Sequence, residues 1–196
     1  MELVLVAEDA LSMAVMRRLL ADCGRGIQVH TAIISGGVDA IRKRVPVYRN
    51  ACRVLPHVLL IDLDQTPCAP DLLESWGLTH KMPTLLIRVA VRTVEAWLLA
   101  DALGLAEQLK VSPTKIPSRP ETLENPKQTL VNLARHSRSR RIASELAPSP
   151  GSRAQVGPLY NTRLCEFVAQ RWSPQKASKG APSLAKTILR LDEFVS

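Results

Sequence analysis

The stretch HVLLIDLD, residues 57–64, carries an unbroken apolar run that ends in two carboxylates. An apolar run without polar alternation is typical of a strand buried on both faces of a parallel sheet. Because side chains alternate across a strand, Asp62 and Asp64 would point the same way if strand geometry continued to residue 64. Two carboxylates so close together favour a hard divalent cation between them. The alternative is that these aspartates only end the strand and face water.

A second apolar strand is predicted at the start of the chain. The run LVLVA, residues 3–7, leads directly into Glu8, and a helical pattern follows over residues 10–22. Functional side chains in open α/β sheets gather where strands end and loops begin. We therefore expect Glu8 to lie near Asp62 and Asp64. Three acids at one point favour Mg²⁺ or Mn²⁺.

Strands and helices alternate along the first half of the chain. Further strands are predicted over residues 27–34 and 84–89, and a single long helix over residues 93–109. Pro46 is expected to kink or start a helix rather than to lie inside one. This alternation predicts an α/β fold with a parallel sheet flanked by helices. Residues 1–111 are assigned to this core, and residues 112–196 to a basic helical extension packed on it. The extension is expected to contain one or two helices over residues 127–146 and further helices over 161–172 and 184–194.

The acidic strand ends resemble those of the Toprim fold, which occurs in topoisomerases, primases and the overcoming-lysogenization-defect class of nucleases. An acid after the first strand and a later Asp-x-Asp strand end, here Glu8 and residues 62–64, carry this resemblance. More closely, the chain resembles the Toprim-like group called domain-of-unknown-function family 4276. That resemblance covers most of the chain and rests on residues 5–20, 57–65, RVAVRTVEAWLLAD (88–101), NPK (125–127) and GPLYN (157–161). Toprim proteins usually have Gly after the first glutamate, where this chain has Asp9.

The resemblance implies a Toprim-like parallel sheet and a divalent-metal-dependent nuclease. Glu8 would be a metal ligand or a metal-bound base, and Asp62 and Asp64 would be metal ligands. Glu95 would bind a second metal, although a helix N-terminal acid favoured by the helix dipole is the alternative. Lys127 would clamp a phosphate, or else be a surface lysine at a helix start. The resemblance further implies an ATPase partner in a bacterial anti-phage defence system.

The net charge of +8 is concentrated in the second half of the chain. Residues 1–100 carry a net charge of +1 and residues 101–196 a net charge of +7. A basic half joined to an acidic site suits a phosphodiester substrate, because cations hold the phosphates. A solvated helix face or a surface for an acidic protein partner are the alternatives. The candidate nucleic-acid contacts are Arg135, Arg138, Arg140, Arg141, Lys176 and Lys179.

Composition is that of a globular chain. A content of 46% hydrophobic residues is enough to bury a core in 196 residues. The four cysteines form no Cys-x-x-Cys pair, so we expect reduced packing residues rather than a zinc site or disulfides. No signal peptide or membrane span is recognisable, which makes the cytoplasm the expected location. Trp97 is expected in the core, and Tyr160 and Asn161 are expected to cap the helix that follows them.

Three classes of function therefore stay open. The first is hydrolysis of DNA or RNA by a metal-dependent Toprim-type nuclease. The second is a non-catalytic scaffold or regulatory subunit that binds nucleic acid or an ATPase partner; Asp9 in place of glycine favours it, and retention of all three acids speaks against it. The third is nucleotidyl transfer, for which the chain has no recognisable companion domain.

Overall fold

The chain forms two compact units. The computed structural model describes residues 1–24, 26–78, 80 and 82–196. The first unit, here called the sheet unit, contains Met1–Val91 and Ala185–Ser196. The second, here called the helical unit, contains Arg92–Leu184. The sequence predicted a single boundary between residues 111 and 112, whereas these units meet along the chain at 91/92 and 184/185.

The sheet unit is built around a four-stranded sheet with the order β2-β1-β3-β4. Its strands are β1 (Glu2–Ala7), β2 (Gln28–Ile34), β3 (His57–Asp62) and β4 (Leu85–Ala90). All neighbouring strands pair in parallel, with Val4 opposite His57 and His57 opposite Leu85. The predicted α/β class with a helical C-terminal region is therefore confirmed.

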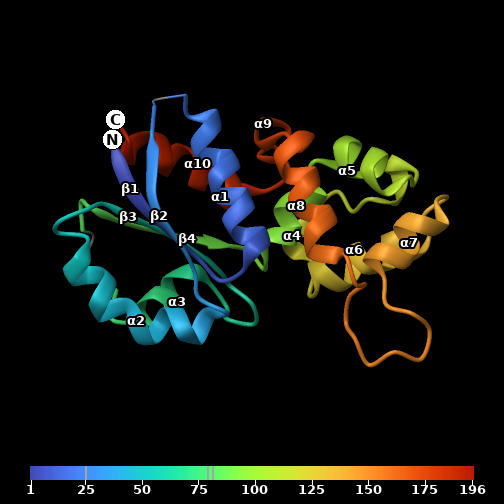
Figure 1. Ribbon diagram of the computed structural model, residues 1–196, viewed down its shortest axis with the longest axis horizontal. Coiled ribbons are helices and arrows are strands. Elements are labelled where there is room, and N and C mark those ends of the chain that lie inside the picture. The colour runs from blue at the N-terminus through green and yellow to red at the C-terminus, as the bar shows by residue number, and fades with distance from the viewer. Residues whose placement is uncertain (25, 79, 81) are drawn as a thin grey trace. The chain divides into compact units, whose positions relative to one another are not determined.

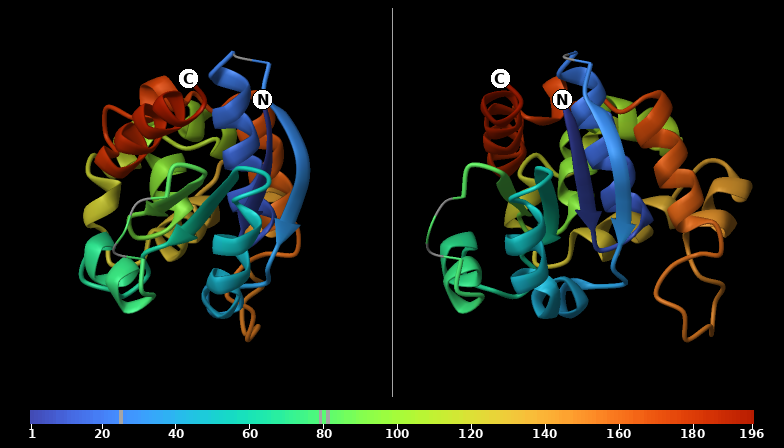
Figure 2. Two further views of the ribbon diagram at one scale, coloured as in Figure 1. Left: turned by 90° about the vertical axis from the view of Figure 1, so that its left-hand side faces the viewer. Right: turned by 60° about the vertical axis from the view of Figure 1, so that its left-hand side comes forward.

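Helices cover both faces of this sheet. The helices α1 (Ala10–Asp22) and α10 (Pro182–Phe194) lie over one face, and α2 (Val38–Ala51) and α3 (Ala69–Ser75) lie over the other (Figures 1 and 2). The strand order explains this division. Right-handed crossovers from β1 to β2 and from β2 to β3 run in opposite directions along the sheet, so they place α1 and α2 on opposite faces.

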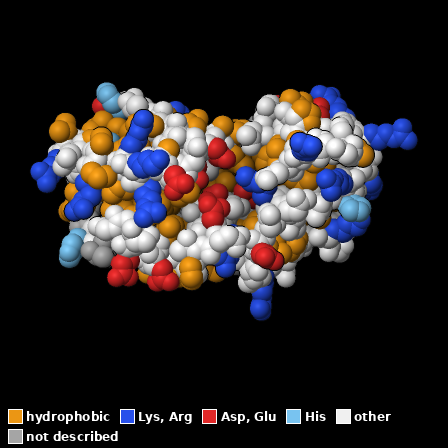
Figure 3. All heavy atoms as spheres, turned by 90° about the horizontal axis from the view of Figure 1, so that it is seen from below, with side chains coloured by type: hydrophobic (Ala, Val, Ile, Leu, Met, Phe, Trp, Pro, Cys, Tyr) orange, Lys and Arg blue, Asp and Glu red, His pale blue; other side chains and the backbone are white. Residues whose placement is uncertain are grey.

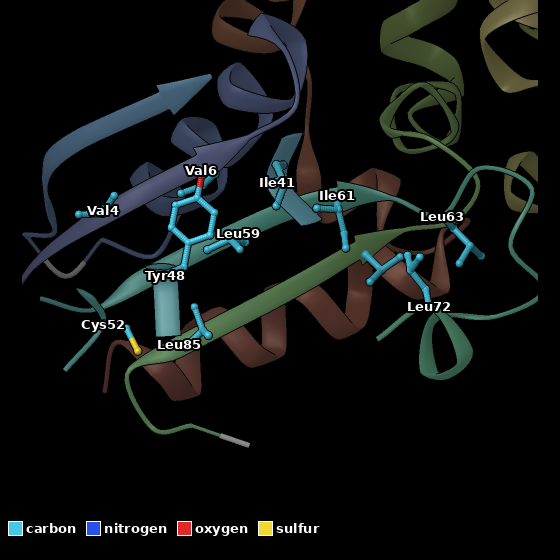
Figure 4. Packing of buried hydrophobic residues seen from close by; sticks show 11 residues of the cluster. Val4, Val6, Ile41, Tyr48, Cys52, Leu59, Ile61, Leu63, Leu72 and Leu85 are labelled. Atoms are coloured by element: carbon cyan, nitrogen blue, oxygen red, sulfur yellow. The ribbon is translucent and has the colours of Figure 1, made fainter. Parts of the chain in front are cut away.

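Alternate residues of the central strands supply a separate core to each face. On the α2 face, Val6, Leu59 and Ile61 pack with Ile41 and Tyr48 of α2 (Figure 4). On the α1 face, the fully buried side chains include Leu3, Leu5, Leu60, Leu11, Val15 and Met16. Burial of both faces explains why β1 and β3 are continuous apolar runs in the sequence.

Pro46 lies inside α2, so the prediction that it would kink or start a helix is wrong. Its ring removes one backbone donor and normally disfavours a helix interior. The flanking residues Ile41, Val45 and Tyr48 are buried on the sheet, with exposed fractions of 0%, 4% and 3%. We attribute the persistence of the helix to this packing, which outweighs the local preference of proline.

The helical unit contains α4 (Val94–Ala100), α5 (Ala102–Leu109), α6 (Pro126–Arg135), α7 (Arg140–Leu146), α8 (Tyr160–Gln170) and α9 (Pro174–Ala177), with short 3-10 turns at Pro113–Lys115 and Pro120–Thr122.

The prediction of one helix over residues 93–109 is wrong, because the helix breaks at Asp101 (φ −84°, ψ 68°). The Asp101 carboxylate accepts hydrogen bonds from the amides of Gly104 (3.3 Å) and Ser173 (2.9 Å). Trp97 lies in the core as predicted, with 0% exposure.

None of the helices in the described ranges is both long and apolar enough to span a membrane. Cys23, Cys52, Cys68 and Cys165 are not joined in disulfides, in agreement with the prediction, and Cys52 is buried in the core on the α2 face of the sheet.

Candidate functional site

The topology creates a switch point between β1 and β3. The chain leaves β1 toward β2 on one side and later leaves β3 toward β4 on the other side. The connections after β1 and β3 therefore run in opposite directions from the carboxyl ends of these two strands. In open α/β sheets this is the place where ligands bind.

Glu8 and Asp62 lie together at this switch point. Glu8 follows the last residue of β1, and Asp62 is the last residue of β3. The backbone amide of Asp62 donates a hydrogen bond of 2.7 Å to Oε1 of Glu8. Both side chains are half-buried. The sequence prediction that brings these two acids to one edge of the sheet agrees with this geometry.

Asp64 does not continue the strand. β3 ends at Asp62, and Asp64 adopts a left-handed conformation with φ of 49°. Its side chain is exposed. The condition under which Asp62 and Asp64 would point the same way is therefore not met. Aspartate is one of the few residues that tolerates this conformation, so the same residue type also suits a turn after the strand.

Asp9, which stands where Toprim proteins usually have glycine, has a local role. It is the N-cap of α1, and its Oδ1 accepts a hydrogen bond of 2.8 Å from the amide of Ser12. Its φ of −142° is extended backbone, so this position does not need a glycine. An aspartate N-cap satisfies one of the free amides at the helix start.

The oxygen chemistry of the switch point fits one type of metal site. Across the described ranges of the chain, no group of three or more His, Cys, Asp or Glu side chains is arranged to hold a metal ion. Mg²⁺, however, often binds through only one or two carboxylates and completes its shell with water and substrate phosphate. Glu8 and Asp62 supply hard oxygen donors of this kind. The pair fits such a site, whereas the predicted role of Asp64 stays a prediction.

A second acidic position lies inside the helical unit. Glu95, the second residue of α4, is only 2% exposed. Its Oε1 accepts a hydrogen bond of 3.2 Å from the Tyr160 hydroxyl and lies 3.6 Å from the Lys127 ammonium. Its Oε2 is buried and has no hydrogen-bond partner among the residues that the structure describes. Two residues from separate predicted motifs, Lys127 and Tyr160, therefore lie beside the carboxylate of Glu95.

This cluster changes the interpretation of its members. Lys127 would have to share its charge with Glu95 to clamp a phosphate, because its ammonium already lies beside that carboxylate. Tyr160 is buried and hydrogen-bonded, rather than a cap. The N-cap of α8 is Leu159, which makes no side-chain capping bond, so the expected capping role of Asn161 is wrong. The role of Glu95 as a metal ligand stays a prediction.

Gly157 explains how Tyr160 reaches Glu95. A Cβ atom at Gly157 would lie 2.4 Å from the carbonyl oxygen of Glu145 and 2.6 Å from the carbonyl carbon of Leu146. The chain therefore crosses the end of α7 at a distance that only glycine permits. Two hydrogen bonds hold the crossing, from the Gly157 amide to Leu146 and from the Leu159 amide to Glu145, each 2.9 Å long. Tyr160 follows directly at the start of α8.

The basic residues predicted to contact nucleic acid are all exposed. They are Arg135, Arg138, Arg140, Arg141, Lys176 and Lys179. Arg141 pairs with Glu145 at 2.8 Å, so part of its charge is neutralised. The Nε of Arg138 donates to the Lys110 carbonyl. Exposure is necessary for phosphate contact but does not distinguish it from a solvated face.

A basic groove on the sheet unit was not predicted from the sequence. Side chains of α2 and the turn after it line this groove together with Trp76, and its basic members are Arg42, Lys43, Arg49 and Arg53. Figure 3 shows Lys and Arg side chains gathered on the side of the view where Figure 1 places α2 and α3. The spacing of Arg42 and Arg49, seven residues apart on α2, was a usable signal. It was hidden because the first hundred residues are nearly neutral overall.

Comparisons with known proteins add no further constraint. No family model, no curated protein and no solved structure matches this chain significantly.

Proposed function

We propose that the protein is a divalent-metal-dependent phosphodiesterase that acts on DNA or RNA, related to the Toprim-like group of domain-of-unknown-function family 4276. The observation that carries the proposal is the meeting of Glu8 and Asp62 at the switch point between β1 and β3, where Oε1 of Glu8 lies 2.7 Å from the amide of Asp62. Two carboxylates at the carboxyl end of a parallel sheet suit metal-assisted chemistry on a phosphate.

Glu8 and Asp62 would hold the ion in this proposal. When bound, Mg²⁺ or Mn²⁺ would polarise a phosphate oxygen and lower the pKa of a bound water. The hydrogen bond from the Asp62 amide holds Oε1 of Glu8 beside the end of β3. Asp9 supports the site indirectly, because its capping bond to Ser12 fixes the start of α1 directly after Glu8.

Basic side chains support the assignment of a nucleic-acid substrate. The groove along α2 gathers four cations, and each Lys or Arg that contacts a phosphate gains affinity by counterion release. An aromatic side chain, Trp76, lies in the same groove, and aromatic rings stack on unpaired bases. This combination favours a substrate with a single-stranded segment.

The proposal is tested by cleavage assays on the purified full-length chain. Double-stranded DNA, single-stranded DNA and transfer RNA would each be incubated with Mg²⁺ and with Mn²⁺. Glu8→Gln and Asp62→Asn keep the side-chain shape and one acceptor oxygen, but they replace the other oxygen with an NH₂ group and remove the charge. Asp71→Asn, an exposed acid at the start of α3, is the matched control. We expect cleavage by the intact chain and the control, and its loss in both site variants. Equal cleavage by all four proteins would refute the assignment.

A non-catalytic module is the second candidate. The observation that favours it is the absence, within the described ranges, of a three-acid group, together with the exposed left-handed position of Asp64. Such a module would bind nucleic acid or an ATPase partner without cleaving it. Gel-shift binding that does not depend on Mg²⁺, combined with no cleavage and no metal-induced rise in melting temperature, would favour this candidate. Action in the cytoplasm beside an ATPase of a defence system is part of either proposal.

A further inference from the structure

A pocket on the sheet unit lies along β4, away from the strand ends that carry Glu8 and Asp62. β4 is an edge strand of the sheet. The pocket has a volume of about 500 Å³, which lies in the range of sites for small organic ligands. Its apolar wall comes from the α3 segment, from β4 and from the end of α10, and includes Leu73, Leu78, Met82, Leu86 and Phe194.

Two arginines line this apolar pocket. Arg88 comes from β4 and Arg190 from α10. Arg190 is paired with Glu193, another lining residue, and both side chains are about half exposed. Arg88 is more enclosed, and its Nε donates a hydrogen bond of 3.2 Å to the hydroxyl of Thr187, which is fully buried. The three charged lining residues give the pocket a net charge of +1; they are Arg88, Arg190 and Glu193.

Arg88 has no carboxylate partner among the residues that the structure describes. Its interaction in the described structure is the bond to the neutral Thr187, and no acid in those parts of the chain lies within ion-pair distance of it. Burial, and then the cation of Arg190, lower the pKa of the Arg88 guanidinium below its usual value. A partly desolvated cation without an anion is unfavourable, and arginine remains charged in proteins. An anion in the pocket would relieve this cost.

We propose that the pocket along β4 binds a small amphipathic anion, whose carboxylate or phosphate group pairs with Arg88 and Arg190 while its apolar body lies against Leu86 and Phe194. The planar guanidinium of Arg88 offers paired donors to two oxygens of such a group. The inference does not rest on the proposed phosphodiesterase activity, because it uses none of the residues of the switch point.

The test is a titration followed by two-dimensional ¹H–¹⁵N spectra of the full-length chain. The probes are sodium octanoate and octyl phosphate, with 1-octanol as the uncharged control of equal chain length. The proposal predicts saturable shifts for at least one anion, centred on residues 86–88 and 190–194 and on the Nε–H of Arg88. It predicts much weaker binding of octanol.

Variants distinguish binding through the charge of Arg88 from non-specific hydrophobic binding in the pocket. Arg88→Gln is expected to raise the dissociation constant of the preferred anion at least about tenfold, because a charge-assisted hydrogen bond is lost. Arg190→Gln, at an exposed position, serves if Arg88→Gln does not fold, and is expected to weaken binding by a smaller factor. Arg44→Gln, an exposed arginine of α2, is the matched control and should bind as the intact chain does. No saturable shift with either anion, or equal binding of octanol, would overturn the proposal. So would unchanged affinity in a folded Arg88→Gln variant.

Discussion

Gly157→Ala should destabilise the helical unit, because the new methyl group has no space. The Cβ atom would lie 2.4 Å from the Glu145 carbonyl oxygen and 2.6 Å from the Leu146 carbonyl carbon, and both are backbone atoms that cannot rotate away. Relief requires the crossing segment to move, which strains its two hydrogen bonds to α7. Overpacking of this kind costs roughly 1–3 kcal/mol. For a chain of this size that corresponds to a fall in melting temperature of roughly 2–12 °C.

Gly180→Ala is the matched control for this prediction. Neither glycine has a positive φ, and at Gly180 the nearest neighbour of a new Cβ, the Ala100 side chain, would lie at an ordinary 3.6 Å. The free energy of unfolding of Gly180→Ala should differ from that of the intact chain by less than about 1 kcal/mol. It should increase if the alanine lowers the conformational entropy of the unfolded chain. Both variants would be compared by thermal unfolding followed by circular dichroism. Equal melting temperatures for the two variants would refute the steric account of Gly157.

Three further predictions concern single side chains. Tyr160→Phe removes the hydroxyl that donates a hydrogen bond to buried Glu95. The free energy of unfolding, measured in urea, should fall by roughly 1–3 kcal/mol. An unchanged free energy of unfolding would show that this hydrogen bond does not stabilise the fold. Hydrogen bonds from Arg163, and then from Arg141, lower the pKa of Glu145 from 4.5 to about 2. The ionised Glu145 therefore stabilises the fold above about pH 4.5, and this stabilisation is lost as the pH falls toward 2. Melting curves of Glu145→Gln should therefore be less sensitive to pH than those of the intact chain between pH 4.5 and pH 2, and parallel curves would contradict this. Arg49→Gln, in the α2 groove, should reduce the slope of log binding constant against log salt by about 0.7–0.9 in gel-shift titrations with DNA, and an unchanged slope would exclude contact between Arg49 and a phosphate.

Local patterns were sufficient to predict the strands of the sheet unit. Residues 3–7 and 58–61 are apolar without alternation because helices cover both faces of β1 and β3. A continuous apolar run of this kind is enough to predict a buried parallel strand from the sequence. The first helix, predicted over residues 10–22, is α1 (Ala10–Asp22). Glu8 and Asp62 could be placed together because parallel strands bring their carboxyl ends to one edge of the sheet.

The errors arose where distant contacts decide local conformation. Asp101 breaks a continuous helical pattern because its carboxylate binds the amide of Ser173, 72 residues away in the chain. Pro46 stays in a helix because neighbouring side chains are buried on the sheet. The partners of Glu95 come from two other motifs, and no periodicity could reveal that Tyr160 points into the helical unit. Such residues can be assigned only after the fold is known.

The most direct test of the central claim is binding of Mn²⁺ to the full-length chain, measured by the loss of the electron paramagnetic resonance signal of free Mn²⁺. The claim is that Glu8 and Asp62 form a cation site at the switch point of the sheet. We predict saturable binding to the intact chain and to Asp71→Asn, and its loss in Glu8→Gln and in Asp62→Asn. Undiminished Mn²⁺ binding by a folded Asp62→Asn variant would contradict the account.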